Sequence, residues 1–177
     1  NCILSKDWLT SEPNVITGIM WCIGAFTKTN DAIAVLTPVY GAFDTSASDA
    51  QRQIIAVPMS RDEDNRYSVD YEAFEAAIIK HEIKLFIHCN PHNPVGHVWT
   101  ESEMDQLFSI CKRHGVLIIS DEIHADFVWD GHTHTVFANL GESYAEHCIV
   151  CTAPSKTFNI AGLQVSNVFI PNETLRK

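Results

Sequence analysis

The sequence predicts an α/β fold in which a mostly parallel sheet carries helices on both of its faces. Short apolar runs, typical of buried strands, alternate along the chain with segments that repeat apolar residues at helical spacing. The connections between these segments are short and rich in turn residues. Repeated strand–helix–strand order with short connections is characteristic of a parallel sheet.

The apolar pattern assigns each element of this fold to a segment. Helices are expected over residues 15–28, 70–80 and 101–114, with a weaker helix over 41–51. Residues 1–13 lack a clear period and predict an arm or loop. Residues 60–66 predict a charged loop, and residues 130–147 a loop with a short helix. Strands are expected over residues 32–36, 53–58, 84–89, 116–120, 148–152 and 167–170.

Composition restricts the class of protein and of partner. The 177 residues are 46% hydrophobic and 19% charged, which predicts one globular domain with a sizeable core. The net charge of -10 argues against nucleic acid or an anionic membrane as partner, since both require a basic face. No apolar run approaches the roughly 18 residues of a membrane span. The chain begins without Met and stops where a helix is expected to begin, so we expect a piece of a longer protein.

The cysteines predict a reducing environment. Most lie inside apolar runs, as small core residues do, and we interpret them as reduced thiols of a cytoplasmic protein. Cys148 and Cys151 have C-x-x-C spacing, but on a strand residues three apart point to opposite faces. That pair therefore predicts neither a redox centre nor a metal clip. The six residues are Cys2, Cys22, Cys89, Cys111, Cys148 and Cys151.

Polar and aromatic side chains follow several of the predicted strands at the point where each strand ends. They are Tyr40, Asn93, Asp121 with His124, and Lys156. Ligands of open α/β sheets bind outside the carboxyl ends of the strands. Taken singly, each residue has a plainer explanation: Tyr40 fills core, Asn93 forms a turn between two Asn-Pro steps, and Lys156 is an exposed loop lysine.

Taken together, these residues match what pyridoxal phosphate (PLP) requires. A lysine in a partly desolvated cleft can form a Schiff base with a carbonyl, and Lys156 is the candidate. Asp121 could hold a ring nitrogen protonated, while Asn93 and His124 could hydrogen-bond a ring hydroxyl. Tyr40 could stack on the ring. The helix that starts near Val15 could bind a phosphate through its N–H groups.

Three motifs carry a resemblance to a known family. They are Asn-Pro-His-Asn-Pro-Val-Gly at 90–96, Ser-Asp-Glu-Ile-His-Ala-Asp at 120–126 and Ala-Pro-Ser-Lys-Thr-Phe-Asn-Ile-Ala-Gly-Leu-Gln at 153–164. Together they resemble the class I/II aminotransferases of the fold-type I PLP enzymes, and within these the cystathionine β-lyase-like (C–S lyase) branch. The resemblance implies that Lys156 is the catalytic residue. The implied cofactor-binding residues are Lys156, Asp121, His124, Asn93, Tyr40, Val15, Ile16 and Ser155.

The resemblance also implies a domain organisation. Residues 14–177 would be the core of the PLP-binding large domain, preceded by an arm, with the C-terminal small domain absent from this chain. The full-length protein would be a homodimer, and the arginine that holds the substrate carboxylate would lie outside this chain. Asn14 stands where the family usually has a glycine. Gln164 stands where many relatives have an arginine, and the lyase branch frequently has a glutamine at that position.

The implied reaction is β-elimination on cystathionine or a related cysteine conjugate, which yields a thiol, pyruvate and ammonia. Transamination by the same residues is the first alternative, and a truncated, non-catalytic cofactor-binding fragment is the second. A metal site at Asp121, His124 and Asp126 is a further alternative. His132 and His134 are interpreted as solvated loop histidines, because no matching ligand spacing accompanies them.

Overall fold

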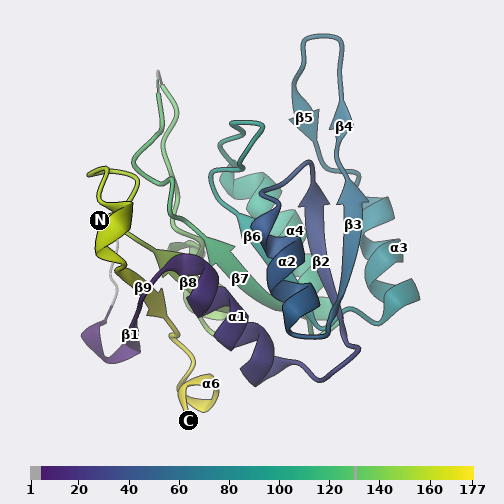
Figure 1. Ribbon diagram of the computed structural model, residues 1–177. Coiled ribbons are helices and arrows are strands. Elements are labelled where there is room, and N and C mark those ends of the chain that lie inside the picture. The colour runs from purple at the N-terminus through teal and green to yellow at the C-terminus, as the bar shows by residue number, and fades with distance from the viewer. Residues whose placement is uncertain (1–4, 130) are drawn as a thin grey trace.

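The computed structural model describes residues 5–129 and 131–177, and a seven-stranded sheet lies at its centre (Figure 1). The strand order is β1-β9-β8-β7-β6-β2-β3. Strands β3, β2, β6, β7 and β8 run parallel, whereas β9 and β1 are antiparallel to their neighbours. The strands are β1 (Leu9–Glu12), β2 (Ala32–Thr37), β3 (Gln53–Pro58), β6 (Leu85–Cys89), β7 (Leu117–Asp121), β8 (Cys148–Thr152) and β9 (Ser166–Phe169). The predicted mostly parallel sheet is confirmed.

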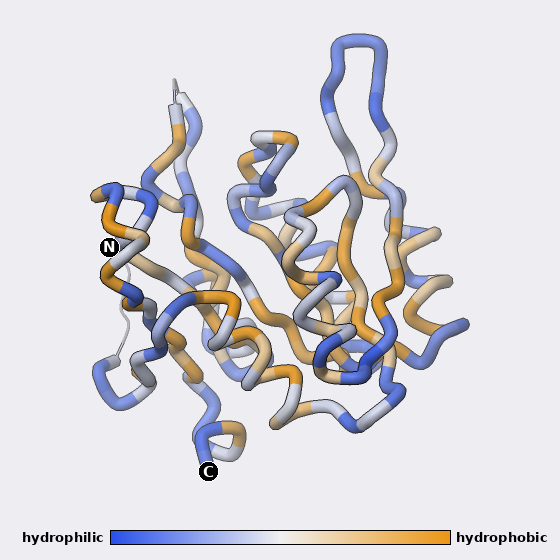
Figure 2. Tube along the Cα trace, viewed as in Figure 1, coloured by the Kyte–Doolittle hydropathy of each residue, from blue (hydrophilic) through white to orange (hydrophobic). Residues whose placement is uncertain are grey.

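Helices cover both faces of this sheet, as predicted. On one face, α1 (Val15–Phe26) and α2 (Ala42–Asp49) bury residues such as Ile19 and Phe43 against the strands. On the other face, α3 (Tyr71–His81) and α4 (Glu101–Arg113) do the same with residues that include Phe74 and Leu107. Figure 2 shows apolar residues along β2, between the two helix layers. The short helices are η1 (Lys6–Trp8), η2 (Phe137–Leu140), α5 (Glu142–Ala145), η3 (Ala161–Leu163) and α6 (Glu173–Arg176).

Side-chain caps fix where the main helices begin. The Asn14 side chain accepts a hydrogen bond from the Thr17 N–H at 2.9 Å and starts α1. Asp70 caps α3 in the same way. At the start of α4, Thr100 and Glu103 form a reciprocal capping box. These caps place each helix start within about one residue of where the apolar spacing predicts it.

Two segments differ from the prediction. Residues 9–12 of the expected arm or loop form β1, an edge strand that pairs with β9 in the register Leu9↔Phe169 to Glu12↔Ser166. Three of its four residues are exposed, so the strand carries no apolar signal and forms through pairing with a distant segment. The expected charged loop of residues 60–66 contains β4 (Ser60–Arg61), which pairs with β5 (Tyr67–Ser68) directly after the loop. The resulting hairpin is hydrophilic at its tip (Figure 2).

The cysteines lie where the apolar runs place them. The five described cysteines are buried and form no disulfide with one another, while Cys2 lies outside the described residues. Cys148 and Cys151 belong to the cores on opposite faces of the sheet, which confirms the interpretation of their spacing. No helix in the described part of the chain is long and apolar enough to cross a bilayer.

The packing of α1 on the sheet predicts opposite effects for two glycines of that helix. A Cβ at Gly18 would lie 2.8 Å from Val168 Cγ2 of β9, whereas a Cβ at Gly24 would meet nothing within 4 Å. We expect Gly18→Ala to lower the free energy of unfolding by about 1–3 kcal/mol through overpacking. Gly24→Ala should raise it by roughly 0.5–1 kcal/mol through helix propensity. Urea denaturation of both variants measures this, and equal stabilisation by the two would contradict the packing.

Candidate active site

A cavity of about 240 Å³ opens at the carboxyl ends of the parallel strands. Strands β2, β6, β7 and β8 all end at this edge, so residues far apart in sequence meet there. The structure brings all eight site residues predicted from the sequence to the lining of this one cavity. They are Val15, Ile16, Tyr40, Asn93, Asp121, His124, Ser155 and Lys156.

Asp121 is the buried polar group of the site. It is the last residue of β7, is only 4% exposed, and accepts a hydrogen bond from the Ile123 N–H at 3.2 Å. Burial raises the pKa of the Asp121 carboxyl to about 7, against the lowering effect of that hydrogen bond. The charge of Glu122 adds to the rise and that of Lys156 opposes it. A cationic partner within the cavity would therefore stabilise the ionised form of this carboxyl.

Lys156 and His124 both line the cavity. His124 is half-buried, and burial together with the neighbouring Lys156 lowers the pKa of its imidazole. Lys156 itself is exposed, which differs from the partly desolvated cleft expected from the sequence. The reason is that its loop, 153–159, projects from the end of β8 as a series of turns, with exposed Phe158 beside it.

The ring of Tyr40 lies at the rim of the cavity. It is 46% exposed and meets the buried Phe43 ring edge-on, with 5.9 Å between centroids and an interplanar angle of 88°. Phe43 therefore supports the ring from one side.

The start of α1 also lines the cavity. The first N–H groups of a helix have no partner within it, and here they belong to Val15 and Ile16, which line the cavity. Asn14, which caps the helix, donates from Nδ2 to Gln164 Oε1 at 3.1 Å. Asn14 and Gln164 thus contact each other and join the helix start to the loop that follows Lys156.

Cys89 is a lining residue that the sequence reasoning did not select. Its sulfur accepts a hydrogen bond from the Asn93 N–H at 3.4 Å and so contacts the turn that carries Asn93. Burial raises the pKa of the Cys89 thiol to about 12, which keeps it protonated and unreactive. Its position at the end of β6 could have identified Cys89 as a lining residue, but its apolar neighbours in the sequence made it resemble an ordinary core residue. Other lining residues that were not selected are Pro13, Asn14, Ile123, Ala153, Ala161, Gln164 and Val165.

The histidine and metal interpretations are partly corrected. His132 is exposed, as expected, but the His134 side chain is only 9% exposed and donates to Glu122 at 2.9 Å. The interpretation of His134 as solvated was wrong, because the loop folds back onto the end of β7. Asp126 accepts from Thr157 at 2.6 Å, and no three His, Cys, Asp or Glu side chains of the described residues are grouped as metal ligands.

Comparison with known proteins identifies the family. Residues 15–177 match the family model for aminotransferase class I and II. The chain belongs to the class I and II aminotransferase family. Cystathionine beta-lyase PatB of Bacillus subtilis is 40% identical over 98% of this chain and 44% of that protein. The chain thus spans less than half the length of this relative.

Solved structures agree with the fold. Cystalysin from Treponema denticola, whose crystal structure contains PLP, superposes with a TM-score of 0.94 at 35% identity, over 98% of this chain and 44% of that one. The PLP-bound C–S lyase from Staphylococcus hominis gives the same TM-score of 0.94 at 33% identity, again over 98% and 44%. This superposition over nearly the whole chain confirms the family fold.

The raised pKa of Asp121 predicts how the ligand-free protein responds to pH. The folded-state pKa of about 7 lies above the ordinary value of 3.8, so the folded state retains its proton longer than the unfolded state does. The contribution of Asp121 to stability is therefore full below pH 3.8 and is lost as pH rises through 7.

We expect Asp121→Asn to remove this loss and to stabilise the ligand-free protein above pH 7 by roughly 1–3 kcal/mol relative to wild type. The measurement is the free energy of unfolding of both proteins across the pH range, with their difference isolating Asp121. A difference that does not vary with pH would contradict the assignment.

Proposed function

We propose that the cavity binds PLP and that the full-length protein is a PLP-dependent C–S β-lyase acting on cystathionine or related cysteine conjugates. The observation that carries the proposal is a buried carboxyl, Asp121, facing the same cavity as Lys156. The names of the relatives, a cystathionine beta-lyase and a C–S lyase, support the reaction class. PLP in the crystal structures of two similar proteins supports the cofactor.

The residues present fit this cofactor. Burial disfavours the ionised form of Asp121, and a protonated ring nitrogen is a cationic partner that would stabilise this form. On the proposed assignment, Asn93 and His124 hydrogen-bond the ring hydroxyl and Tyr40 stacks on the ring. The N–H groups of Val15 and Ile16, together with Ser155, would hold the phosphate, because the helix dipole favours an anion there.

The proposed chemistry assigns separate tasks to two residues. PLP, when bound, supplies an electron sink that stabilises negative charge at the substrate Cα. Lys156 would hold the cofactor covalently at rest, and the substrate amine would displace it. The freed Nζ would then take the proton from Cα as general base. Asp121 keeps the proton on the ring nitrogen. The thiolate would then leave Cβ, and water would hydrolyse the unsaturated amine that remains to pyruvate and ammonia.

Transamination is the alternative for the same residues. In that reaction Lys156 returns the proton to the cofactor and no β-substituent leaves. The name of the matching family, which covers aminotransferases, favours keeping this alternative. Release of pyruvate from cystathionine without a keto acid supports the lyase, and strict dependence on a keto acid supports the aminotransferase.

The proposal includes a larger assembly. Residues 14–177 would form the core of the cofactor-binding domain, with the small domain and the arginine for the substrate carboxylate outside this chain. Phe158 and Leu163, close to Lys156 in the sequence, are 69% and 71% exposed, which favours coverage by a further domain or a second subunit of a homodimer. The buried thiols favour a reducing compartment such as the cytoplasm.

The covalent role of Lys156 can be tested by chemical trapping. The full-length protein is incubated with PLP, reduced with borohydride, digested and examined by peptide mass spectrometry. We expect one adduct, on Lys156, and loss of both this adduct and the visible absorbance in Lys156→Ala. Lys177, which pairs with Glu173 on the surface, serves as an internal control and should remain unlabelled. Labelling spread over several lysines, or unchanged in Lys156→Ala, would reject the proposed site.

A further inference from the structure

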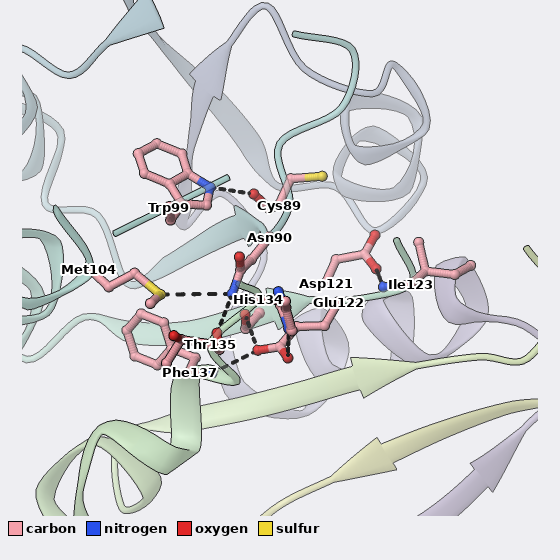
Figure 3. A network of polar contacts seen from close by, with 11 residues as sticks. Cys89, Asn90, Trp99, Met104, Asp121, Glu122, Ile123, His134, Thr135 and Phe137 are labelled. Carbon is pink, nitrogen blue, oxygen red and sulfur yellow. Dashed lines mark hydrogen bonds and ion pairs between the residues drawn. The ribbon is translucent and has the colours of Figure 1, made fainter. Parts of the chain in front are cut away.

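The loop that carries His124 leaves the sheet directly after β7 and returns to it at residues 134–137. Glu122 lies at the point of departure and is 2% exposed. Its backbone carbonyl accepts from the Ala125 N–H at 3.0 Å, at the outgoing end of the loop. Its side chain accepts from His134 Nε2 and from the Phe137 N–H, both at 2.9 Å, at the returning end (Figure 3). Glu122 therefore binds both ends of the loop.

The direction of the Glu122 side chain follows from strand geometry. Successive side chains at the end of a strand point to opposite faces, so Asp121 faces the cavity and Glu122 faces away from it. Ser120, two residues earlier, lies on the same side as Glu122 and donates to it at 2.9 Å. A buried carboxylate is tolerated where its oxygens accept several hydrogen bonds, and here three donors fulfil that need.

A second anchor comes from the neighbouring strand. Asn90, just past β6 and 1% exposed, donates from Nδ2 to the Thr135 carbonyl at 3.1 Å (Figure 3). Its backbone N–H donates to the Asp121 carbonyl at 2.8 Å, and the Glu122 N–H donates to the Cys151 carbonyl at 2.8 Å. The returning segment is therefore attached to two adjacent strand ends on the side opposite the cavity.

We propose that Glu122 is a positioning residue for Asp121 and His124. Its carboxylate closes the loop onto the end of β7 and thereby fixes where the two cavity-facing side chains lie. This inference rests on the proposed function, because the side chains so fixed are those assigned to the cofactor ring.

Four variants of the full-length protein, with a control, test the positioning role. Glu122→Gln keeps the shape of the side chain but presents an amide donor to the His134 N–H. His134→Ala removes one donor and tests the same contact from a less buried residue, in case Glu122→Gln does not fold. His134→Gln restores a donor, and Asp121→Asn serves as the direct comparison. The matched control is Glu75→Gln, which changes a half-buried carboxylate that pairs with Arg113 and His114 and does not line the cavity.

Three readouts separate positioning from general stability. They are the dissociation constant for PLP, the visible circular dichroism per bound PLP at saturation, and the melting temperature. We expect Glu122→Gln and His134→Ala to weaken PLP binding by about tenfold, the scale of outer-shell changes around bound groups, and to reduce the induced circular dichroism. His134→Gln should recover most of both signals. Glu75→Gln should change neither.

The outcomes distinguish this inference from the proposed function. If Glu122→Gln and His134→Ala lower only the melting temperature, while Asp121→Asn weakens PLP binding, the positioning role is rejected and the cofactor site stands. If Asp121→Asn also leaves PLP binding and its circular dichroism unchanged, the proposed cofactor site itself is rejected.

Discussion

Parallel pairing of the central strands is the constraint on which the site depends. Because β2, β6, β7 and β8 run in the same direction, their carboxyl ends form one edge, and the loops that leave this edge surround a single cavity. The antiparallel strands complete the arrangement. β1 pairs with β9 and leads within three residues into α1, so the start of that helix is placed beside the loop after β8.

Burial determines the chemistry that this edge can support. Asp121 and Glu122 are adjacent buried acids, but they face opposite sides of the sheet. Glu122 is surrounded by three donors within the chain, whereas Asp121 accepts only one backbone hydrogen bond among the described residues. The hydrogen-bonding needs of Glu122 are therefore met within the protein. Asp121 can still accept from a cation, which is the property that a site for a protonated heterocycle requires.

Much of the fold and the composition of the site could be predicted from the sequence. Buried parallel strands are continuous apolar runs, and the residue after each run is at the functional edge by topology alone. The features that could not be predicted from the sequence depend on contacts between distant segments. Strand β1 has no pattern of its own and forms against β9. His134 is buried because its loop returns to Glu122, which no local spacing encodes. The exposure of Lys156 follows from the turns by which its loop leaves the end of β8, and no local pattern encodes that path.

The anchoring of the loops differs in a way that matches their proposed tasks. The loop before Tyr40 is held where His92 Nε2 donates to the Pro38 carbonyl at 3.0 Å, and the segment around His124 is held by Glu122. The Lys156 side chain has no such partner among the described residues, and its loop is joined to the rest through Thr157 and Asp126. A group that only binds a ring gains from a fixed position, because fixing it lowers the entropic cost of binding. A lysine that first bonds to a cofactor and then takes a proton from substrate must reach two atoms in turn, and a flexible side chain on an anchored loop allows that movement.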